Sequence, residues 1–235
     1  AEMAGATGRK VEADNYRARR EAVCAAFAKA YWTKDSTLAV DTQTAHVLAL
    51  WAEMLPEAAR PRIADRLAAK IEAAGGRMAT GFLGTKPLLP MLTARGHHDL
   101  AVRLFQSRQF PSWGYEVVNG ANSVWERWDS YTREHGFNGL AGNQNASMNS
   151  FSHYSFGAVT EWMFRDLAGM DTDGPGYRRL RLRPAPPARG RRAEGAPPLD
   201  WVKASYVSPR GPITMEWRRN GATFSCAIGI PANTS

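Results

Sequence analysis

Apolar residues recur every three or four positions through most of the first 170 residues, the spacing that places them on one face of an α-helix. Ile63, Leu67 and Ile71 show this spacing, and Gly75-Gly76 supplies a C-terminal stop after them. Asp41 or Thr42 is a suitable N-cap for another such segment. The pattern predicts six helices, over residues 12–32, 42–55, 61–74, 86–95, 98–107 and 154–168.

The periodicity changes after Gly169, where apolar and polar residues begin to alternate as they do in strands. The hairpin signal Arg219-Asn220-Gly221 separates the last two of these runs. Strand-like runs cover residues 177–183, 200–207, 212–218 and 222–230. We therefore expect a mainly α domain over residues 1–170, followed over 171–235 by a small and incomplete antiparallel β-sandwich module.

The composition narrows the class of protein. At 44% hydrophobic residues the chain can form a packed core, and it has no run of 18 apolar residues, so no membrane partner is expected. No signal peptide is visible, which slightly favours the cytoplasm. Cys24 lies among alanines and a phenylalanine and is interpreted as a buried free thiol, far in sequence from Cys226. We expect neither a cofactor nor a metal site.

The net charge of +8 raises the possibility of a nucleic-acid partner. Much of the excess is local, because seven arginines fall within residues 178–192, where proline and glycine interrupt them. This stretch is typical of a basic strand and loop, not of a helix that enters a groove of DNA. We therefore expect no nucleic-acid function.

The long connection over residues 108–150 carries the densest group of aromatic residues, and ordered loops of this length are usually functional. Within it, Trp125-Glu126-Arg127-Trp128-Asp129-Ser130 places carboxylates among indoles. Aromatic faces stack on the C–H faces of sugar rings, and a carboxylate held among them can transfer protons. The pattern favours a carbohydrate-processing site. The alternative is that Trp125 and Trp128 form the apolar face of a helix start beside a solvated Glu126, but the preceding turn residues 119–122 favour a loop.

Five segments, in this order, resemble the bacterial α-L-rhamnosidases of glycoside hydrolase family 78. They are Asp41-Thr42-Gln43-Thr44-Ala45, Thr80-Gly81-Phe82-Leu83-Gly84-Thr85, Pro111-Ser112-Trp113-Gly114-Tyr115, Trp125-Glu126-Arg127-Trp128-Asp129 and Met148-Asn149-Ser150-Phe151-Ser152-His153-Tyr154. The resemblance implies an (α/α)6 toroid of twelve helices and inverting hydrolysis of terminal α-L-rhamnose. It implies that Glu126 is the general base and that the sugar pocket is shaped by Trp113, Tyr115, Trp125, Trp128 and His153.

The chain departs from the family pattern in one respect. The upstream Asp-Glu-Arg-rich segment that holds the family's general acid has no counterpart here, and six helices are half of a toroid. We therefore expect a C-terminal fragment whose partner is the missing N-terminal half of the catalytic domain, and which is nearly inactive by itself. The alternatives are another α/α-toroid glycosidase, or a sugar-binding remnant without catalysis.

Overall fold

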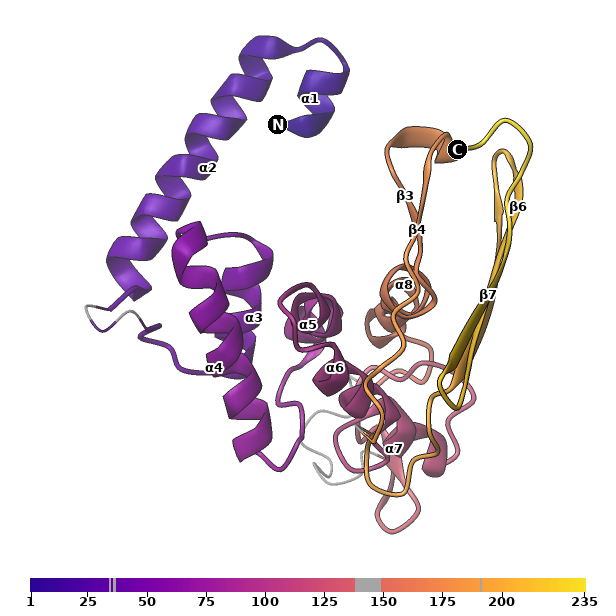
Figure 1. The fold of residues 1–235 in the computed structure, drawn as a ribbon. Coiled ribbons are helices and arrows are strands. Elements are labelled where there is room, and N and C mark those ends of the chain that lie inside the picture. Colours follow the sequence, from indigo (N-terminus) through magenta and orange to yellow (C-terminus); the bar gives the residue numbers. More distant parts are fainter. Residues whose placement is uncertain (34, 36, 138–148, 191) are drawn as a thin grey trace.

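The computed structural model describes residues 1–33, 35, 37–137, 149–190 and 192–235 (Figure 1). Met148, the first residue of the fifth segment named above, lies outside the described residues, as does Arg191 of the arginine-rich stretch. The described part is mainly helical up to residue 168 and mainly β after it, in the order that the sequence predicts. One short antiparallel pair, β1 (Tyr131–Thr132) with β2 (Gly136–Phe137), lies within the helical part.

Each of the six expected helices is present. The α-helices are α1 (Glu2–Ala6), α2 (Lys10–Tyr31), α3 (Gln43–Trp51), α4 (Arg60–Ala73), α5 (Phe82–Ala94), α6 (His98–Gln106), α7 (Trp113–Val118) and α8 (Val159–Trp162). The shorter turns are η1 (Glu57–Ala59), η3 (Ser155–Ala158), the π-helical η4 (Met163–Ala168) and η5 (Pro175–Tyr177).

The helices differ from the expectation in several places. Helix α3 ends at Trp51, four residues before its expected end. Helix α5 starts four residues early because it tolerates Pro87 and Pro90 in its interior. Helix α7 lies inside the stretch expected to be a loop. Its N-cap is Ser112, whose hydroxyl accepts a hydrogen bond from the Tyr115 amide at 3.0 Å. The single helix expected over 154–168 is η3, α8 and η4 in succession.

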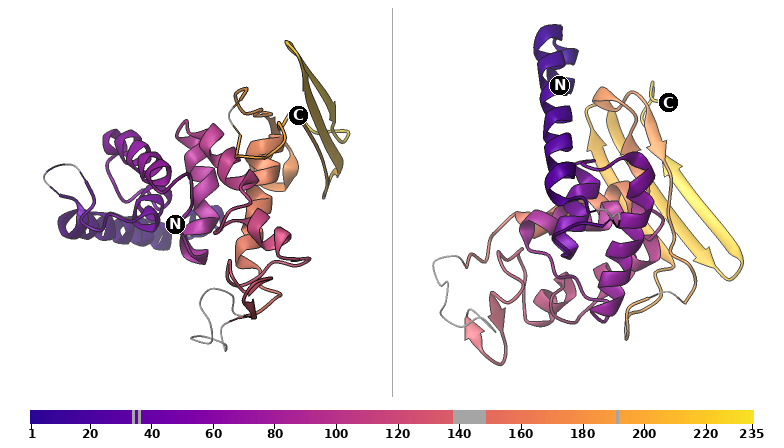
Figure 2. Two further views of the ribbon diagram at one scale, coloured as in Figure 1. Left: turned by 90° about the horizontal axis from the view of Figure 1, so that it is seen from below. Right: turned by 90° about the vertical axis from the view of Figure 1, so that its left-hand side faces the viewer.

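The helices form two layers around one apolar core (Figures 1 and 2). Helix α5 contacts α3 on one side and η3 and α8 on the other, and these make one layer. Helices α4 and α6 pack against α3 and α5 as the second layer. The core between them is filled by side chains such as Leu50, Ile63 and Leu88, each almost fully buried. This arrangement is a stack of helical hairpins, which is the repeating unit of the expected toroid.

Helix α2 extends well beyond this core (Figure 1). Ala13 is the single buried residue among the 22 residues of α2, all of which the structure describes. Phe27 packs against the core at the C-terminal end of the helix, but Tyr31, one turn further on, remains 44% exposed. Cys24 is a free thiol, half-buried beside Met54, so it is less buried than the sequence predicts.

The strands of the C-terminal part are β3 (Met170–Thr172), β4 (Leu180–Leu182), β5 (Trp201–Ser208), β6 (Gly211–Asn220) and β7 (Thr223–Gly229). All pairings are antiparallel: β3 pairs with β4, and β5, β6 and β7 form one sheet with β6 in the centre. The predicted hairpin is confirmed, with Asn220 opposite Thr223. Strand β3 was not expected, because the sequence from Asp171 onward is rich in turn residues.

The two parts are joined through η4. Its C-terminus is Gly169, at φ 79°, where an added Cβ would lie 2.1 Å from the Arg183 carbonyl carbon, so no other residue fits. The inner face of the large sheet buries Ile213, Met215 and Trp217 against this region. The Trp217 indole donates to the Leu167 carbonyl at 3.0 Å. These contacts fix the sheet to the end of the helical layer.

Candidate active site

Two of the segments singled out in the sequence lie side by side. The Glu126 amide donates to the Ser150 carbonyl at 2.9 Å, and the His153 amide donates to the Val124 carbonyl at 2.8 Å. The Ser150 amide in turn donates to Glu126 Oε2 at 2.8 Å. Residues 149–153 therefore hold both the backbone and the carboxylate of Glu126 in place.

A tight turn positions α7 and its first residue, Trp113. The Ser112 hydroxyl donates to the Ser107 carbonyl at 2.8 Å while it caps α7. An added Cβ on Gly114 would lie 2.3 Å from the Ser107 carbonyl oxygen, which explains glycine after Trp113. The turn places Trp113 against the core, where its indole donates to the Phe156 carbonyl at 2.9 Å.

Three aromatic rings from distant parts of the chain form one stack. Trp128 lies flat on Phe156, with ring centroids 3.7 Å apart and planes 9° from parallel. Trp113 meets Trp128 edge-on at 5.2 Å. The Trp128 indole also donates to the Thr80 carbonyl at 3.2 Å, which anchors the loop to the start of α5. Ring contacts fix all three residues, and the indole hydrogen bonds of Trp113 and Trp128 add to them, so the stack forms a rigid wall.

A cavity of about 300 Å³ opens against this wall. It is lined by Gly81, Phe82, Phe110, Glu126, Arg127, Trp128, Asp129 and Phe156. The Arg127 guanidinium pairs with both oxygens of Asp129, at 3.1 and 3.2 Å. The cavity thus combines an aromatic wall with a carboxylate and an ion pair, an arrangement that can hold a sugar ring and transfer a proton beside it.

The structure distributes the six predicted site residues between the cavity and its support. Glu126 and Trp128 line the cavity. Trp113 supports Trp128 from behind, and Trp125 is 4% exposed, with its ring edge-on to Phe151 at 5.6 Å. Tyr115 packs edge-on against Phe110.

His153, the sixth predicted residue, is half-buried beside the cavity, without being one of its lining residues. Its ring lies against Phe82, which does line the cavity, with centroids 6.1 Å apart. Its Nδ1 accepts the Ser155 amide at 3.4 Å. This contact leaves Nε2 as the ring nitrogen for any further hydrogen bond.

Three lining aromatics were not among the predicted site residues. Phe82 lies within the second rhamnosidase-like segment, and Phe110 directly precedes the third. Their positions beside these segments could have predicted that both residues line the site. Phe156 lies within the helix expected over residues 154–168, and an apolar residue in a helix gives no local signal of a second role.

A buried carboxyl lies next to the segment that carries Glu126. Glu116, on α7, is 3% exposed, and its Oε1 has no hydrogen-bond partner among the described residues. Burial raises the pKa of Glu116 to about 8, although a hydrogen bond from the Trp125 backbone partly opposes this shift. Burial, and then the charge of Asp129, raises the pKa of the neighbouring Tyr115. The raised pKa favours the neutral form of Glu116 at pH 7, and the residue contacts the segment that carries Glu126 through Trp125.

Among the described residues, no three His, Cys, Asp or Glu side chains lie close enough together to hold a metal ion. None of the described helices is long and apolar enough to cross a membrane.

The sequence matches two family models in succession. Residues 1–167 match the bacterial alpha-L-rhamnosidase 6 hairpin glycosidase domain, and residues 169–235 match the bacterial alpha-L-rhamnosidase C-terminal domain. An alpha-L-rhamnosidase of Streptomyces avermitilis is 40% identical over 210 residues, which are 89% of this chain and 19% of that protein. One of Formosa agariphila is 33% identical over 239 residues, covering 100% of this chain and 24% of that protein.

Solved structures agree with these matches. The crystal structure of the Streptomyces avermitilis alpha-L-rhamnosidase complexed with L-rhamnose superimposes with a TM-score of 0.84 and 38% identity, covering 99% of this chain and 21% of that one. The Aspergillus terreus enzyme gives a TM-score of 0.88 at 27% identity and 26% of its length. The chain thus spans about a fifth to a quarter of the relatives that it matches. In sequence and in fold, from the helical hairpins to the antiparallel strands, it belongs to the bacterial α-L-rhamnosidase family.

Proposed function

We propose that this chain is the part of an inverting α-L-rhamnosidase that carries the general base, and that the whole enzyme removes terminal α-L-rhamnose from a glycoside or polysaccharide. The observation that carries the proposal is the Glu126 carboxylate, which lines an aromatic-walled cavity and is oriented by the Ser150 amide. One of its oxygens accepts that amide, which leaves the other to accept a proton from an attacking water. A water activated in this way attacks the sugar on the face opposite the leaving group.

The surrounding residues suit a rhamnose ring. Trp128 and Phe82 offer apolar faces to the C–H groups and the methyl group of the sugar. His153, beside Phe82, hydrogen-bonds a sugar hydroxyl through Nε2. Trp113, Trp125 and Tyr115 act by holding these groups in place, because their rings pack under the wall or beside it.

The general acid comes from outside this chain. An inverting enzyme needs a second carboxyl group roughly 6.5–9.5 Å from the base. Of the described carboxyl groups, Asp129 shares the cavity with Glu126 but is bound to Arg127 through both oxygens, which makes it a poor proton donor. Glu116 is buried and does not line the cavity.

The missing acid is supplied by the N-terminal half of the catalytic domain, which packs against residues 1–170. An open apolar groove of about 520 Å³ between α2 and α3 is suited to this contact. It is lined by residues such as Phe27, Tyr31, Leu48 and Trp51. An apolar surface of this kind, left uncovered on one side of a hairpin stack, favours association. Residues 171–235 are then the first strands of a larger β-sandwich module.

A chimera tests the proposal. Residues 1–235 replace the matched segment of the Streptomyces avermitilis enzyme, which supplies the remaining four-fifths of the protein. The parent chimera should hydrolyse p-nitrophenyl α-L-rhamnoside. Glu126→Gln should lower kcat by about 10³-fold with little change in KM, because general-base catalysis contributes roughly 10²–10⁴-fold.

The matched control is Glu134→Gln, the same chemical change on an exposed residue eight positions along, which should leave kcat within about twofold of the parent. Near-parental turnover by Glu126→Gln would remove Glu126 from the role. A folded chimera that binds rhamnose without hydrolysis would favour a sugar-binding remnant, and turnover of another glycoside in preference would favour a different toroid glycosidase.

A further inference from the structure

Arg127 lines the candidate active site directly beside Glu126 in the chain. The residues 126–129 all line the cavity, because the chain turns there. The Ser130 amide donates to the Arg127 carbonyl at 3.1 Å, and the Ser130 hydroxyl donates to the same carbonyl at 3.0 Å. The Arg127 amide donates to the Ser130 hydroxyl at 3.2 Å. These contacts hold the backbone of the turn without using the Arg127 side chain.

A buried carboxylate fixes the Arg127 side chain. The Arg127 Nη2 donates to Oδ1 and Oδ2 of Asp129, at 3.1 and 3.2 Å, and the Asp129 side chain is 10% exposed. Both contacts use the same nitrogen. The described part of the chain offers this guanidinium no other hydrogen bond or ion pair, so the N–H groups on Nε and Nη1 have no protein partner there.

These free N–H groups are accessible. Within the described ranges, the buried side-chain atoms without a partner include Arg95 Nε and Glu116 Oε1, but no atom of Arg127. The Arg127 side chain is 21% exposed and belongs to the lining of the cavity. A ligand in the cavity therefore meets N–H donors whose direction Asp129 has already set, which reduces the entropy lost on binding.

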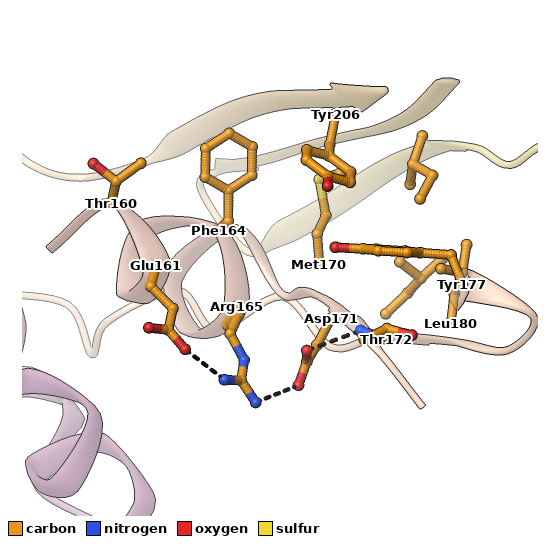
Figure 3. Close-up of a pocket in the computed structure, with 12 residues that line it drawn as sticks. Thr160, Glu161, Phe164, Arg165, Met170, Asp171, Thr172, Tyr177, Leu180 and Tyr206 are labelled. Atoms are coloured by element: carbon orange, nitrogen blue, oxygen red, sulfur yellow. Dashed lines mark hydrogen bonds and ion pairs between the residues drawn. The ribbon is translucent and has the colours of Figure 1, made fainter. Parts of the chain in front are cut away.

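Arg165 provides a contrast, because both of its terminal nitrogens are occupied (Figure 3). It lies at another cavity, of about 520 Å³, between η4 and the strands. Its Nη1 donates to Glu161 at 2.7 Å and its Nη2 donates to Asp171 at 3.0 Å. Figure 3 shows these three side chains pointing away from the aromatic rings of that cavity. Arg165 thus bridges two carboxylates, whereas Arg127 keeps one terminal nitrogen for a ligand.

The charges around the candidate active site favour a neutral ligand. Glu126, Arg127 and Asp129 are the charged residues among the described ones that line the cavity. Asp129 balances the guanidinium, and Glu126 adds a negative charge, so the lining disfavours a carboxylate or a phosphate. A sugar hydroxyl oxygen accepts a hydrogen bond from a guanidinium without bringing a charge into the cavity.

We infer that Arg127 is a further substrate-binding residue, whose free N–H groups donate to a hydroxyl oxygen of the rhamnose ring, and that Asp129 is a positioning residue that acts through Arg127. The choice of rhamnose rests on the proposed function, whereas the free donors and their orientation do not. Arg127 then holds the ring while Glu126 accepts the proton of the attacking water.

The test is an NMR titration of the 235-residue chain with methyl α-L-rhamnopyranoside. The Trp128 indole N–H reports the cavity, and the Arg127 Nε–H reports the guanidinium. We expect both signals to move with the same saturable dependence on sugar concentration. Arg127→Met should weaken the titration of the Trp128 signal by about tenfold, the loss expected for one hydrogen bond from a charged donor.

Further variants separate binding from a structural role. Arg127→Lys keeps the charge beside Asp129 and should weaken the titration by about threefold only. Asp129→Asn should also weaken it by about threefold, and the double variant Arg127→Met/Asp129→Asn should bind no more weakly than Arg127→Met, because Asp129 acts through Arg127. The matched control Arg133→Met, at an exposed arginine of the same connection, should stay within about twofold of the parent. Unchanged methyl signals of Leu88 show that the helical core of each variant is intact.

Two outcomes overturn the role of Arg127. The first is a Trp128 signal that does not titrate in the parent chain. The second is a titration that Arg127→Met and Arg127→Lys both leave within about twofold of the parent. Additive losses in the double variant would overturn the positioning role of Asp129.

The chimera separates this inference from the proposed function. There Arg127→Met should raise KM by about tenfold and keep kcat within about threefold of the parent, whereas Glu126→Gln lowers kcat. An unchanged KM in Arg127→Met together with lost turnover in Glu126→Gln would remove Arg127 from binding and leave the proposed function standing. A raised KM in Arg127→Met with near-parental turnover in Glu126→Gln would do the reverse.

Discussion

Glu116, which contacts the backbone of Trp125, allows a direct test of how burial changes a carboxyl pKa next to the candidate site. Its carboxyl is buried, and its pKa is raised from the ordinary 4.5 to about 8. Below pH 4.5 the group is protonated in both the folded and the unfolded chain, so it carries no pH-dependent cost. Above pH 4.5 the unfolded chain ionises while the folded chain stays neutral, so the folded state loses relative stability until pH 8.

The magnitude follows from the two pKa values. Each pH unit in this window lowers the free energy of unfolding by about 1.4 kcal/mol, so the full loss is about 4 to 5 kcal/mol. Glu116→Gln removes the ionisable group and keeps the shape and the acceptor for the Trp125 amide. The extra buried N–H donors of the amide carry a cost that does not change with pH. The slope of stability against pH, and not its value at one pH, therefore isolates the effect.

The assay is urea unfolding at pH 5, 6, 7 and 8, followed by tryptophan fluorescence and far-ultraviolet circular dichroism. The variant should gain about 4 kcal/mol relative to the parent chain between pH 5 and pH 8. Glu57→Gln, the same change at an exposed residue of η1, should give a curve parallel to the parent's. Parallel curves for the parent and Glu116→Gln would show that Glu116 is already ionised in the folded chain at pH 7, and the reasoning from burial would then be wrong.

Three further predictions concern the site and its frame. In the chimera, His153→Ala should raise KM for p-nitrophenyl α-L-rhamnoside by about three- to tenfold with an unchanged thermal midpoint, as expected for one lost hydrogen bond; a variant that simply unfolds would make His153 structural. The 235-residue chain without a partner should hydrolyse this substrate at a negligible rate, because general acid catalysis contributes roughly 10²–10⁴-fold; robust turnover would place the acid within these residues, and Asp129 and Glu116 would be the first to replace. Gly114→Ala should lower the free energy of unfolding by about 2–3 kcal/mol in urea titrations, because its Cβ would meet the Ser107 carbonyl; a change below about 0.5 kcal/mol would contradict that packing.

The sequence by itself determined the order and type of most elements. Helical spacing marked α4, where Ile63, Leu67 and Ile71 all become fully buried, because an amphipathic stripe is a local property that the fold only has to cover. The β6–β7 hairpin followed from Asn220-Gly221 for the same reason: the turn depends on the backbone freedom of those residues. The aromatic and acidic residues from Trp125 to Asp129 marked the loop that holds Glu126 and Trp128 at the cavity.

Tertiary structure decided which aromatic residues face that cavity. Trp125 and Trp128 are three residues apart and chemically alike, yet one packs on Phe151 and the other stacks on Phe156 at the cavity wall. Their environments come from segments 26 and 28 residues away, so no local pattern could distinguish them. Strand β3 exists for a similar reason: its turn-like sequence becomes a strand because β4 offers it a partner.

The buried Glu116 is the clearest case of this limit. In sequence it is one acidic residue within the long connection over residues 108–150, where no apolar periodicity marks it as buried. It is buried because the loop bearing Trp125 folds across α7, where the backbone of Trp125 hydrogen-bonds the carboxyl group. Periodicity reports which face of an element is apolar, whereas burial depends on what packs over that face. The protonation state of Glu116 therefore depends on the tertiary contact between α7 and the loop that carries Trp125.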